Sequence, residues 1–383
     1  MAMLTVGDPV PWFVIPSSVG EDLRIDLLGG ARLVVVFLGS LGDERAASLW
    51  AGLSARDAEL RARDIELIGV STDDADCERH ARRYPSGKPI MLWDRSRRAS
   101  MAFGIPSVVS AGGAGEPPVL PVFLLERGLR VVDVIDLGRN DRDGLRVVQR
   151  IDALWPSGEE TPPGLAPVLV MPDVLDAAMC RRLIGLWHEE NDESGYSRQL
   201  ADGRQVTILD DRKKRRRDRF LAQDHPLRRE LLVLISRRVV PTVRRVFQYE
   251  ITRVERYCIA CYDAADGGFF GPHRDFSGPG SHRAFAMTLN LNTNEYEGGD
   301  LRFPEYGSRL YRPDSGSAIV FSGSLLHEAR PVTFGRRFAL LSFFFGDREA
   351  QLLSAYHRRH GTGYEMVDLR PGARDKAADP PVP

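Results

Sequence analysis

The chain has 383 residues, 43% hydrophobic and 27% charged, which is an ordinary balance for a soluble globular protein and enough length for two domains. Its formal net charge is -1, so no global field would draw it to nucleic acid or to an anionic membrane, and neither is an expected partner. The N-terminus lacks a secretory signal pattern, and no apolar run reaches the roughly 20 residues of a membrane span, so we expect a cytoplasmic protein.

The first 155 residues alternate between strand and helix patterns. Residues 31–39 form a continuous apolar run, typical of a central strand that is covered on both faces, and residues 65–72 predict a second buried strand. Residues 44–64 carry leucines at helical spacing, and residues 74–84 predict a short helix. Two further strands are predicted over 119–126 and 129–137. This alternation predicts an α/β layered domain.

This first part resembles the thioredoxin-fold peroxiredoxins in its opening VGDPVPWF, its strands LVVVFLG and IELIGVS, and its segment LPVFLLERGLRVV. The resemblance implies a cis proline at Pro121. It also implies a peroxidatic cysteine after the strand that ends at residue 39, but the sequence there, SLGDERAASLW, contains none. A peroxidase without a thiolate has no nucleophile. Residues 1–155 are therefore expected to form a redox-inactive thioredoxin-like domain for scaffolding or binding.

The cysteines offer little redox chemistry. The four present are too few for a disulfide scaffold of this size. Cys77 follows the second strand, the wrong place for a peroxidatic thiol, and leaves a thiol peroxidase as a less favoured alternative. Cys258 and Cys261 form C-x-x-C within a strand pattern, where residues three apart point to opposite faces. We expect two buried side chains there.

Residues 156–166 are rich in proline and glycine and predict a linker, followed by a second domain over 167–350 and a polar C-terminal tail over 351–383. The second domain opens with a strand, a turn and an amphipathic helix. The basic run 213–217 is flanked by aspartates, which favours a solvated loop, or an arginine that meets an acidic partner, over a nucleic-acid patch. From residue 254 onward, short apolar strands separated by turn residues predict a β-sandwich or barrel.

Metal-binding side chains lie at two points of this barrel. His273 and Asp275 are two residues apart, and such side chains project to the same face of a strand. His327 follows a later apolar strand. Two imidazoles and one carboxylate form the facial triad of non-haem Fe(II) oxygenases, which leaves coordination positions open. A keto acid can chelate such an iron, and Arg337, ten residues after His327, offers a two-pronged donor to its distal carboxylate.

Three stretches resemble the Fe(II)/2-oxoglutarate-dependent dioxygenases of the prolyl 4-hydroxylase-like branch, and they follow that family's order: YDAADGGFFGPHRD, TLNLNTNEYEGGDLRFPEYG and RPDSGSAIVFSGSLLHEARPVTFGRRFAL. The resemblance implies a double-stranded β-helix, or jelly roll, with flanking helices and the metal in the mouth of the barrel. By position, it implies that Fe(II) is bound by His273, Asp275 and His327.

The same resemblance assigns the co-substrate. Arg337, not Arg336, matches the arginine that holds 2-oxoglutarate, and Tyr262 matches a tyrosine that contacts it. Core packing is an equally good explanation of Tyr262. Asn290 stands where many members have tyrosine, which leaves its contact with 2-oxoglutarate open. His282 is expected in a loop or a supporting position rather than as a ligand.

The resemblance implies an enzyme that hydroxylates a C–H bond with Fe(II), 2-oxoglutarate and O2, releases succinate and CO2, and has ascorbate as a candidate accessory reductant. The expected substrate is a peptidyl or protein side chain or an amino-acid-like molecule, and nothing in the barrel sequence chooses between them. The oligomeric state is unknown. The alternative is a non-catalytic binding or sensing protein that uses both domains, against which the complete triad and Arg337 argue.

Overall fold

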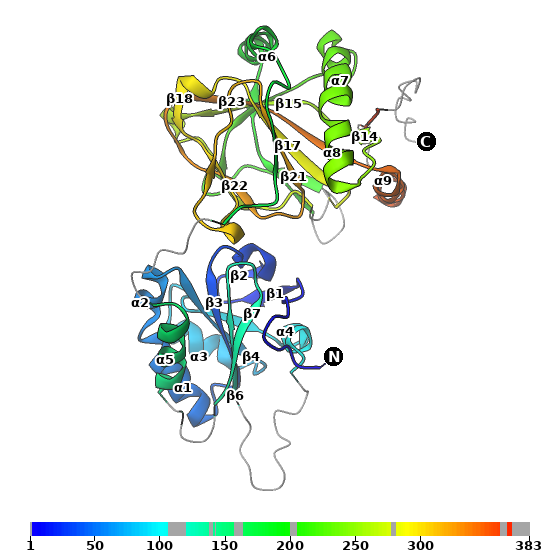
Figure 1. Cartoon of the computed structure of the whole chain (residues 1–383). Coiled ribbons are helices and arrows are strands. Elements are labelled where there is room, and N and C mark those ends of the chain that lie inside the picture. Colours follow the sequence, from blue (N-terminus) through cyan, green and yellow to red (C-terminus); the bar gives the residue numbers. More distant parts are fainter. Residues whose placement is uncertain are drawn as a thin grey trace. The chain divides into compact units, whose positions relative to one another are not determined.

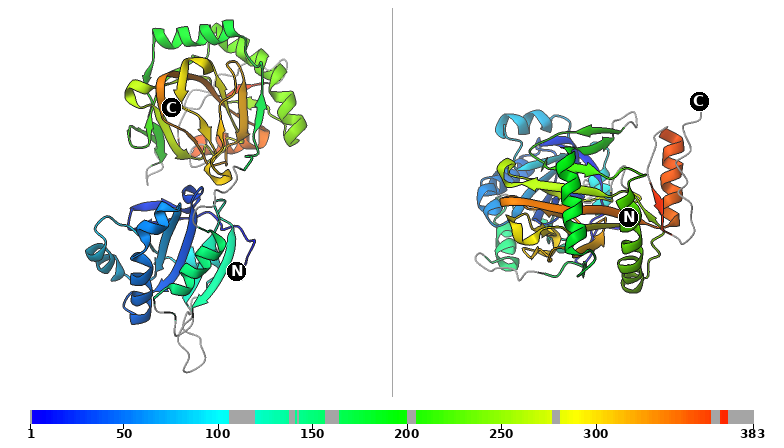
Figure 2. Two further views of the ribbon diagram at one scale, coloured as in Figure 1. Left: turned by 60° about the vertical axis from the view of Figure 1, so that its left-hand side comes forward. Right: turned by 90° about the horizontal axis from the view of Figure 1, so that it is seen from above.

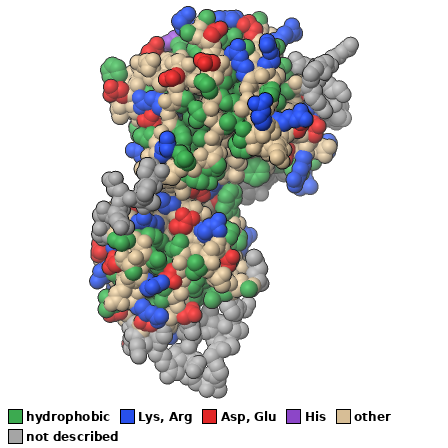
Figure 3. Space-filling model, in the orientation of Figure 1, with side chains coloured by type: hydrophobic (Ala, Val, Ile, Leu, Met, Phe, Trp, Pro, Cys, Tyr) green, Lys and Arg blue, Asp and Glu red, His purple; other side chains and the backbone are tan. Residues whose placement is uncertain are grey.

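The computed structural model describes residues 2–105, 120–137, 141, 143–156, 164–199, 205–276, 281–360 and 366–369. The chain forms two compact units, Met1–Gly164 with Pro304–Gly307, and Leu165–Phe303 with Ser308–Pro383 (Figure 1). On the face shown in Figure 3, acidic and basic side chains are spread over both units. None of the helices in the described ranges has the length and apolar character needed to cross a membrane.

The first unit contains a seven-stranded sheet in the order β2-β1-β5-β4-β3-β6-β7. Strands β3, β4 and β5 are parallel to one another, whereas β6 and β7 form an antiparallel hairpin beside β3. The strands are β1 (Val14–Ser17), β2 (Gly20–Arg24), β3 (Arg32–Gly39), β4 (Ile65–Ser71), β5 (Ile90–Trp93), β6 (Leu120–Leu125) and β7 (Val131–Leu137). A parallel β3–β4 pair next to an antiparallel hairpin is the arrangement of a thioredoxin-like fold, as predicted.

Helices cover both faces of this sheet. The helices are α1 (Glu44–Ser54), α2 (Asp57–Ala62), α3 (Asp76–Arg83), α4 (Arg98–Phe103) and α5 (Leu145–Leu154), with a 3-10 turn at Ile25–Leu28. Alternate residues of β3 enter two different apolar clusters: Val34 and Val36 pack with α1 and α5, whereas Val35 and Phe37 pack with α4. Burial on both faces explains the continuous apolar run of β3.

One expectation for the first unit requires correction. The cis peptide bond among the described residues is Lys88–Pro89, so the expected cis bond at Pro121 is wrong. Pro121 instead continues the extended strand β6, where it lies opposite Asp136 of β7. The helical pattern over 44–64 forms two helices, α1 and α2, which are separated at Ala55–Arg56, and Leu49, Leu53 and Leu60 all enter one apolar cluster.

The second unit is a double-stranded β-helix built from two facing antiparallel sheets (Figure 2). The larger sheet has the order β8-β21-β17-β23-β15-β13-β9, with β14, β18 and β24 paired at its margins. Its strands are β8 (Leu169–Met171), β9 (Asp192–Glu193), β13 (Arg217–Phe220), β14 (Arg253–Val254), β15 (Cys258–Asp263), β17 (Phe285–Asn290), β18 (Tyr296–Gly298), β21 (Ala318–Ser322), β23 (Val332–Phe345) and β24 (Val367–Asp368).

The smaller sheet has the order β12-β16-β22-β19-β20, and a separate hairpin pairs β10 with β11. These strands are β12 (Lys214–Arg215), β16 (Phe269–His273), β19 (Leu301–Arg302), β20 (Leu310–Tyr311), β22 (His327–Ala329), β10 (Tyr196–Gln199) and β11 (Gln205–Ile208). The flanking helices are α6 (Ala177–Glu189), α7 (Pro226–Arg238), α8 (Val240–Phe247) and α9 (Asp347–His360).

The two faces of the larger sheet differ: one packs against helices α6 and α7, and the other faces the smaller sheet. Ile259, Met287 and Leu340 pack in one apolar cluster with Leu183 of α6 and Leu231 of α7. Their sequence neighbours point the opposite way, because successive side chains of a strand alternate between faces. The inner face, toward the smaller sheet, therefore receives the side chains that are interleaved with this core.

The C-x-x-C pair behaves as expected from its strand. Cys258 and Cys261 both lie on β15 and are buried. Burial raises the pKa of each thiol to about 12, so neither is a thiolate at neutral pH.

The expected polar tail is wrong for its described part. Helix α9 runs through residue 360, and its Leu353 is buried against Phe345. Beyond it, β24 pairs with β14 and returns the chain to the larger sheet. The apolar positions Ala350 and Leu353 are one helical turn apart, which gives α9 a face to bury. Residues 370–383 lie outside the described residues.

Candidate metal centre

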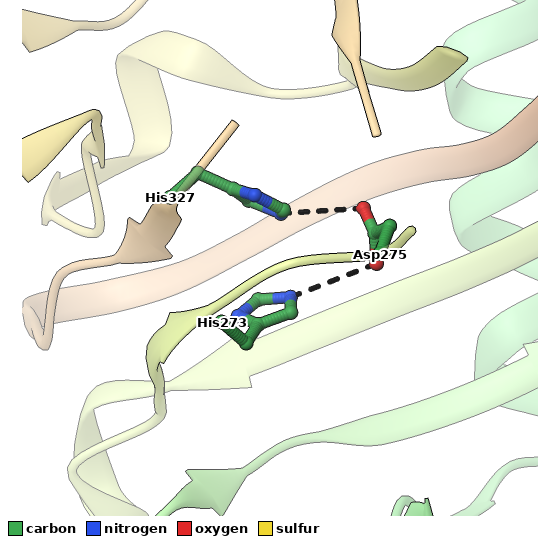
Figure 4. A group of neighbouring side chains, drawn as sticks. All are labelled: His273, Asp275 and His327. Atoms are coloured by element: carbon green, nitrogen blue, oxygen red, sulfur yellow. Dashed lines mark ion pairs between the residues drawn. The ribbon is translucent and has the colours of Figure 1, made fainter. Parts of the chain in front are cut away.

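The pairing of two strands brings His273 and His327 together. His273 ends β16, His327 begins β22, and the register places them opposite each other. Asp275 follows β16 and turns its carboxylate between the two rings (Figure 4). Its Oδ1 lies 3.8 Å from His273 Nε2 and its Oδ2 lies 3.3 Å from His327 Nε2. One ligand atom from each residue lies within 4.8 Å of the others, so the three could hold a single metal ion.

Hydrogen bonds prepare both imidazoles for a metal. His273 Nδ1 lies 2.8 Å from the carbonyl of Gly271, and His327 Nδ1 lies 3.0 Å from the carbonyl of Leu325. A carbonyl oxygen can only accept, so both Nδ1 atoms carry the proton and both Nε2 lone pairs are free. Burial lowers the pKa of His273 well below its usual value, and neighbouring His327 lowers it further. The ring therefore stays neutral, the form that binds metals.

Arg337 projects from β23 onto the inner face. It lies opposite Tyr262 in the register, is only 3% exposed, and its guanidinium carbon is 5.2 Å from the centre of the Tyr262 ring. Arg336, one residue earlier, points outward and forms an ion pair of 2.6 Å with Asp263. The alternation of the strand thus places Arg337 inside the barrel, which agrees with the choice of Arg337 over Arg336.

The guanidinium of Arg337 has neutral partners. Its Nη2 donates to Thr288 Oγ1 and to Asn290 Oδ1, both at 3.3 Å. Its Nε is buried and has no acceptor within the described ranges. Burying a charge with only neutral acceptors is unfavourable, so this pocket favours an anionic ligand. A carboxylate of a 2-oxo acid fits these donors.

Tyr262 and Asn290 both lie next to Arg337. Asn290 Nδ2 donates to the carbonyl of Pro313 at 3.0 Å, which turns its oxygen toward the guanidinium. Tyr262 is 3% exposed, and its hydroxyl accepts a hydrogen bond of 3.2 Å from Arg216 Nη1. Contact with Arg337 is therefore the interaction that both residues share.

Sequence reasoning missed a buried cationic cluster beside these residues. Lys214 and Arg216 belong to the basic run that was expected to be a solvated loop, which is wrong for both, because both side chains are buried. The expected acidic partner of an arginine is present: Arg216 Nη2 lies 2.6 Å from Asp218 Oδ2. Burial alone would raise the pKa of Asp218, but Arg216 and Lys214 outweigh it and hold that pKa below its usual value.

Lys214 belongs to the same cluster. Its ammonium donates to Ser194 Oγ at 2.6 Å and to the carbonyl of Gly195 at 2.7 Å, and lies over the Phe270 ring. That ring stacks on His273, with 3.6 Å between the centroids. Burial, helped by the charge of Arg216, lowers the pKa of Lys214 to about 7. The sequence did contain a signal of this burial: Lys214, Arg216 and Asp218 are spaced two residues apart, so on a strand their side chains project to the same face.

His282 lies outside the triad, as expected. It is buried in the loop before β17, with Nε2 3.1 Å from Glu255 Oε2. Glu255 in turn forms an ion pair with Arg283 at 2.6 Å. His282 therefore belongs to a supporting polar network.

Comparison with known proteins gives matches for both units. Residues 257–345 match the 2OG-Fe(II) oxygenase superfamily. A PKHD-type hydroxylase of Parvibaculum lavamentivorans is 32% identical over 197 residues, which are 46% of this chain and 77% of that protein. A prolyl-4-hydroxylase structure from Pseudomonas putida has a TM-score of 0.35 at 19% identity and covers 46% of this chain and 91% of its own. The AhpC structure of Mycobacterium tuberculosis has a TM-score of 0.32 at 23% identity, covering 41% and 96%.

Proposed function

The chain belongs to the 2OG-Fe(II) oxygenase superfamily, and from this premise we propose that it hydroxylates a C–H bond of a peptidyl, protein or amino-acid-like substrate, with succinate and CO2 as co-products. It is a 2-oxoglutarate-dependent dioxygenase, which takes Fe(II), 2-oxoglutarate and O2. The observation that carries the proposal is the convergence of two Nε2 lone pairs and one carboxylate on a single point.

In this proposal, Fe(II) is held by His273, Asp275 and His327. Two neutral imidazoles and one carboxylate leave the divalent ion a net positive charge and open positions for a chelating keto acid. Iron bound with 2-oxoglutarate supplies the activation of O2. The carbonyls of Gly271 and Leu325 keep both rings in the metal-binding tautomer, so the protein needs no proton transfer before the metal enters.

Arg337 and Tyr262 are proposed to hold 2-oxoglutarate. The guanidinium presents N–H donors to a carboxylate, and burial strengthens that pairing by excluding water. Asn290 and Thr288 fix the guanidinium from one side through their oxygens. Asn290 is thus proposed to act on the co-substrate through Arg337 rather than by direct contact.

The thioredoxin-like unit is proposed to serve binding or scaffolding. At the position after β3, Asp43 caps α1 by accepting from the backbone N–H groups of Arg45 and Ala46, where a peroxidase would carry its thiol. A unit that binds a partner protein favours a protein substrate for the barrel. The alternative, a non-catalytic sensor, predicts ligand binding without turnover.

The test is direct. The full chain is loaded anaerobically with Fe(II), titrated with 2-oxoglutarate and followed by visible absorption of the chelate. It is then exposed to O2, and succinate is quantified by mass spectrometry. We expect saturable binding and succinate formation, both lost in His273→Ala. Iron-loaded protein that neither binds 2-oxoglutarate nor makes succinate would refute the proposal, and binding without succinate would favour the sensor.

A further inference from the structure

Two guanidinium groups lie near the phenol of Tyr262. The guanidinium carbon of Arg337 is 5.2 Å from the ring centre, and that of Arg216 is 5.6 Å from it. Only Arg216 reaches the hydroxyl, through Nη1 at 3.2 Å. The two arginines therefore have different roles toward the same tyrosine.

Arg216 is held firmly in this position. Its Nη2 lies 2.6 Å from Asp218 Oδ2, and its side chain is only 8% exposed. Ser194 also donates to Asp218, and Lys214 donates to Ser194, so the carboxylate that anchors Arg216 is itself fixed. A buried, anchored guanidinium of this kind presents its remaining N–H groups in a defined direction.

The chemistry of the donors sets the direction of the phenolic hydrogen. A guanidinium has no acceptor atom, so the Tyr262 oxygen must accept from Arg216. The hydroxyl then keeps its own hydrogen for another acceptor, and the described residues supply none. Arg337, whose guanidinium also lies near this ring, has a buried Nε that lacks an acceptor in those residues. The Tyr262 hydroxyl and Arg337 Nε are therefore two donors that a carboxylate ligand could satisfy.

We propose that Arg216 is a positioning residue for the co-substrate: by donating to Tyr262 Oη, it directs the phenolic hydrogen to a carboxylate of 2-oxoglutarate. This inference rests on the proposed function, and it adds a residue that the family resemblance did not assign. The proposal thereby assigns a role in co-substrate binding to the cluster of Lys214, Arg216, Asp218 and Ser194. The charges of Lys214 and Arg216 add to the burial that keeps His273 neutral, but burial is the main cause, so the effect expected of Arg216 is on binding of the keto acid.

The experiment measures the dissociation constant of 2-oxoglutarate in the anaerobic Fe(II) protein for Arg216→Met, Tyr262→Phe and the double variant. Arg215→Met is the matched control, because that neighbouring arginine is exposed and bonds the carbonyl of Asp266. We expect both single variants to bind 2-oxoglutarate roughly tenfold more weakly, the value of one hydrogen bond to a charged group. Iron affinity and the control should match the wild type.

The double variant is decisive. If Arg216 acts through Tyr262, Arg216→Met causes no further loss once the hydroxyl is absent. Multiplicative losses, or a wild-type dissociation constant in Arg216→Met, would overturn the inference. Should Arg216→Met fail to fold because Asp218 loses its partner, Arg216→Met/Asp218→Asn removes both charges and must show the same weakening. Wild-type binding by Tyr262→Phe alone would also refute it.

These outcomes differ from a failure of the proposed function. Wild-type iron protein that does not bind 2-oxoglutarate refutes the function itself. Wild-type protein that binds it, with variants that bind equally well, refutes only the role of Arg216.

Discussion

Replacing Arg337 by methionine is expected to weaken co-substrate binding while leaving the ligand-free protein as stable as before, or more stable. Burying an ion costs several kcal/mol, and hydrogen bonds to neutral oxygens return about 1 kcal/mol each. Arg337 makes two such bonds, both at 3.3 Å, which is long for an N–H donor. Its stacking on Tyr262 adds about 1 kcal/mol. These contacts do not offset desolvation, so Arg337→Met should change the unfolding free energy by between zero and about +2 kcal/mol.

Binding of 2-oxoglutarate is expected to be weakened by Arg337→Met, although the stability of the apoprotein is not. A guanidinium–carboxylate pair in a buried site contributes about 2.7 kcal/mol, so the dissociation constant of 2-oxoglutarate should rise about 100-fold. Urea unfolding of the apoprotein and calorimetric titration of the anaerobic Fe(II) protein measure the two effects. Arg336→Met is the control: it breaks only the half-exposed pair with Asp263 and should leave the dissociation constant unchanged.

A clear result would refute this reasoning. If Arg337→Met destabilised the apoprotein by the 3–5 kcal/mol or so that follows loss of one member of a buried ion pair, Arg337 would have an anionic partner within the protein. An unchanged dissociation constant would remove it from the co-substrate site.

Three other predictions concern the ligands, the lysine and the thiol. Asp275→Ala should weaken Fe(II) binding more than about 100-fold by calorimetry, whereas Asp263→Ala should not. Lys214 has a pKa of about 7 in the folded protein and 10.5 as its reference value, so between these pH values the unfolded chain binds the extra proton. Stability should therefore rise with pH from about 7 upward, by at most about 1.4 kcal/mol per pH unit, in urea unfolding; the slope should vanish in Lys214→Met and persist in the exposed control Lys213→Met. Peroxide consumption should be negligible and identical in wild type and Cys77→Ser; a rate that depends on Cys77 would revive the thiol peroxidase.

Local patterns predicted the architecture well where one residue type recurs with a fixed period. The apolar run of β3 predicted a strand covered on both faces, and the short strands after residue 254 predicted the barrel. Patterns failed where a segment depends on distant partners. Helix α9 looked like a polar tail because, among its described side chains, Ala350 and Leu353 are the buried ones, and β24 pairs two residues with β14.

The site shows the same division. The separation of two residues between His273 and Asp275 predicted that their side chains lie together, and the family resemblance selected Arg337 over Arg336. The alternation of β23 then places Arg337 inside the barrel and Arg336 outside it. The approach of His327 to His273 depends on the pairing of β16 with β22, and the burial of Arg216 depends on the barrel closing over β12 and β13. Only the tertiary structure decides the approach of His327 to His273 and the burial of Arg216, because both depend on residues that are far apart in the sequence and follow no periodic pattern. From the sequence alone the basic run is expected to be solvent-exposed. In the folded protein, Arg216 contacts Asp218 and Tyr262, and Lys214 lies over Phe270.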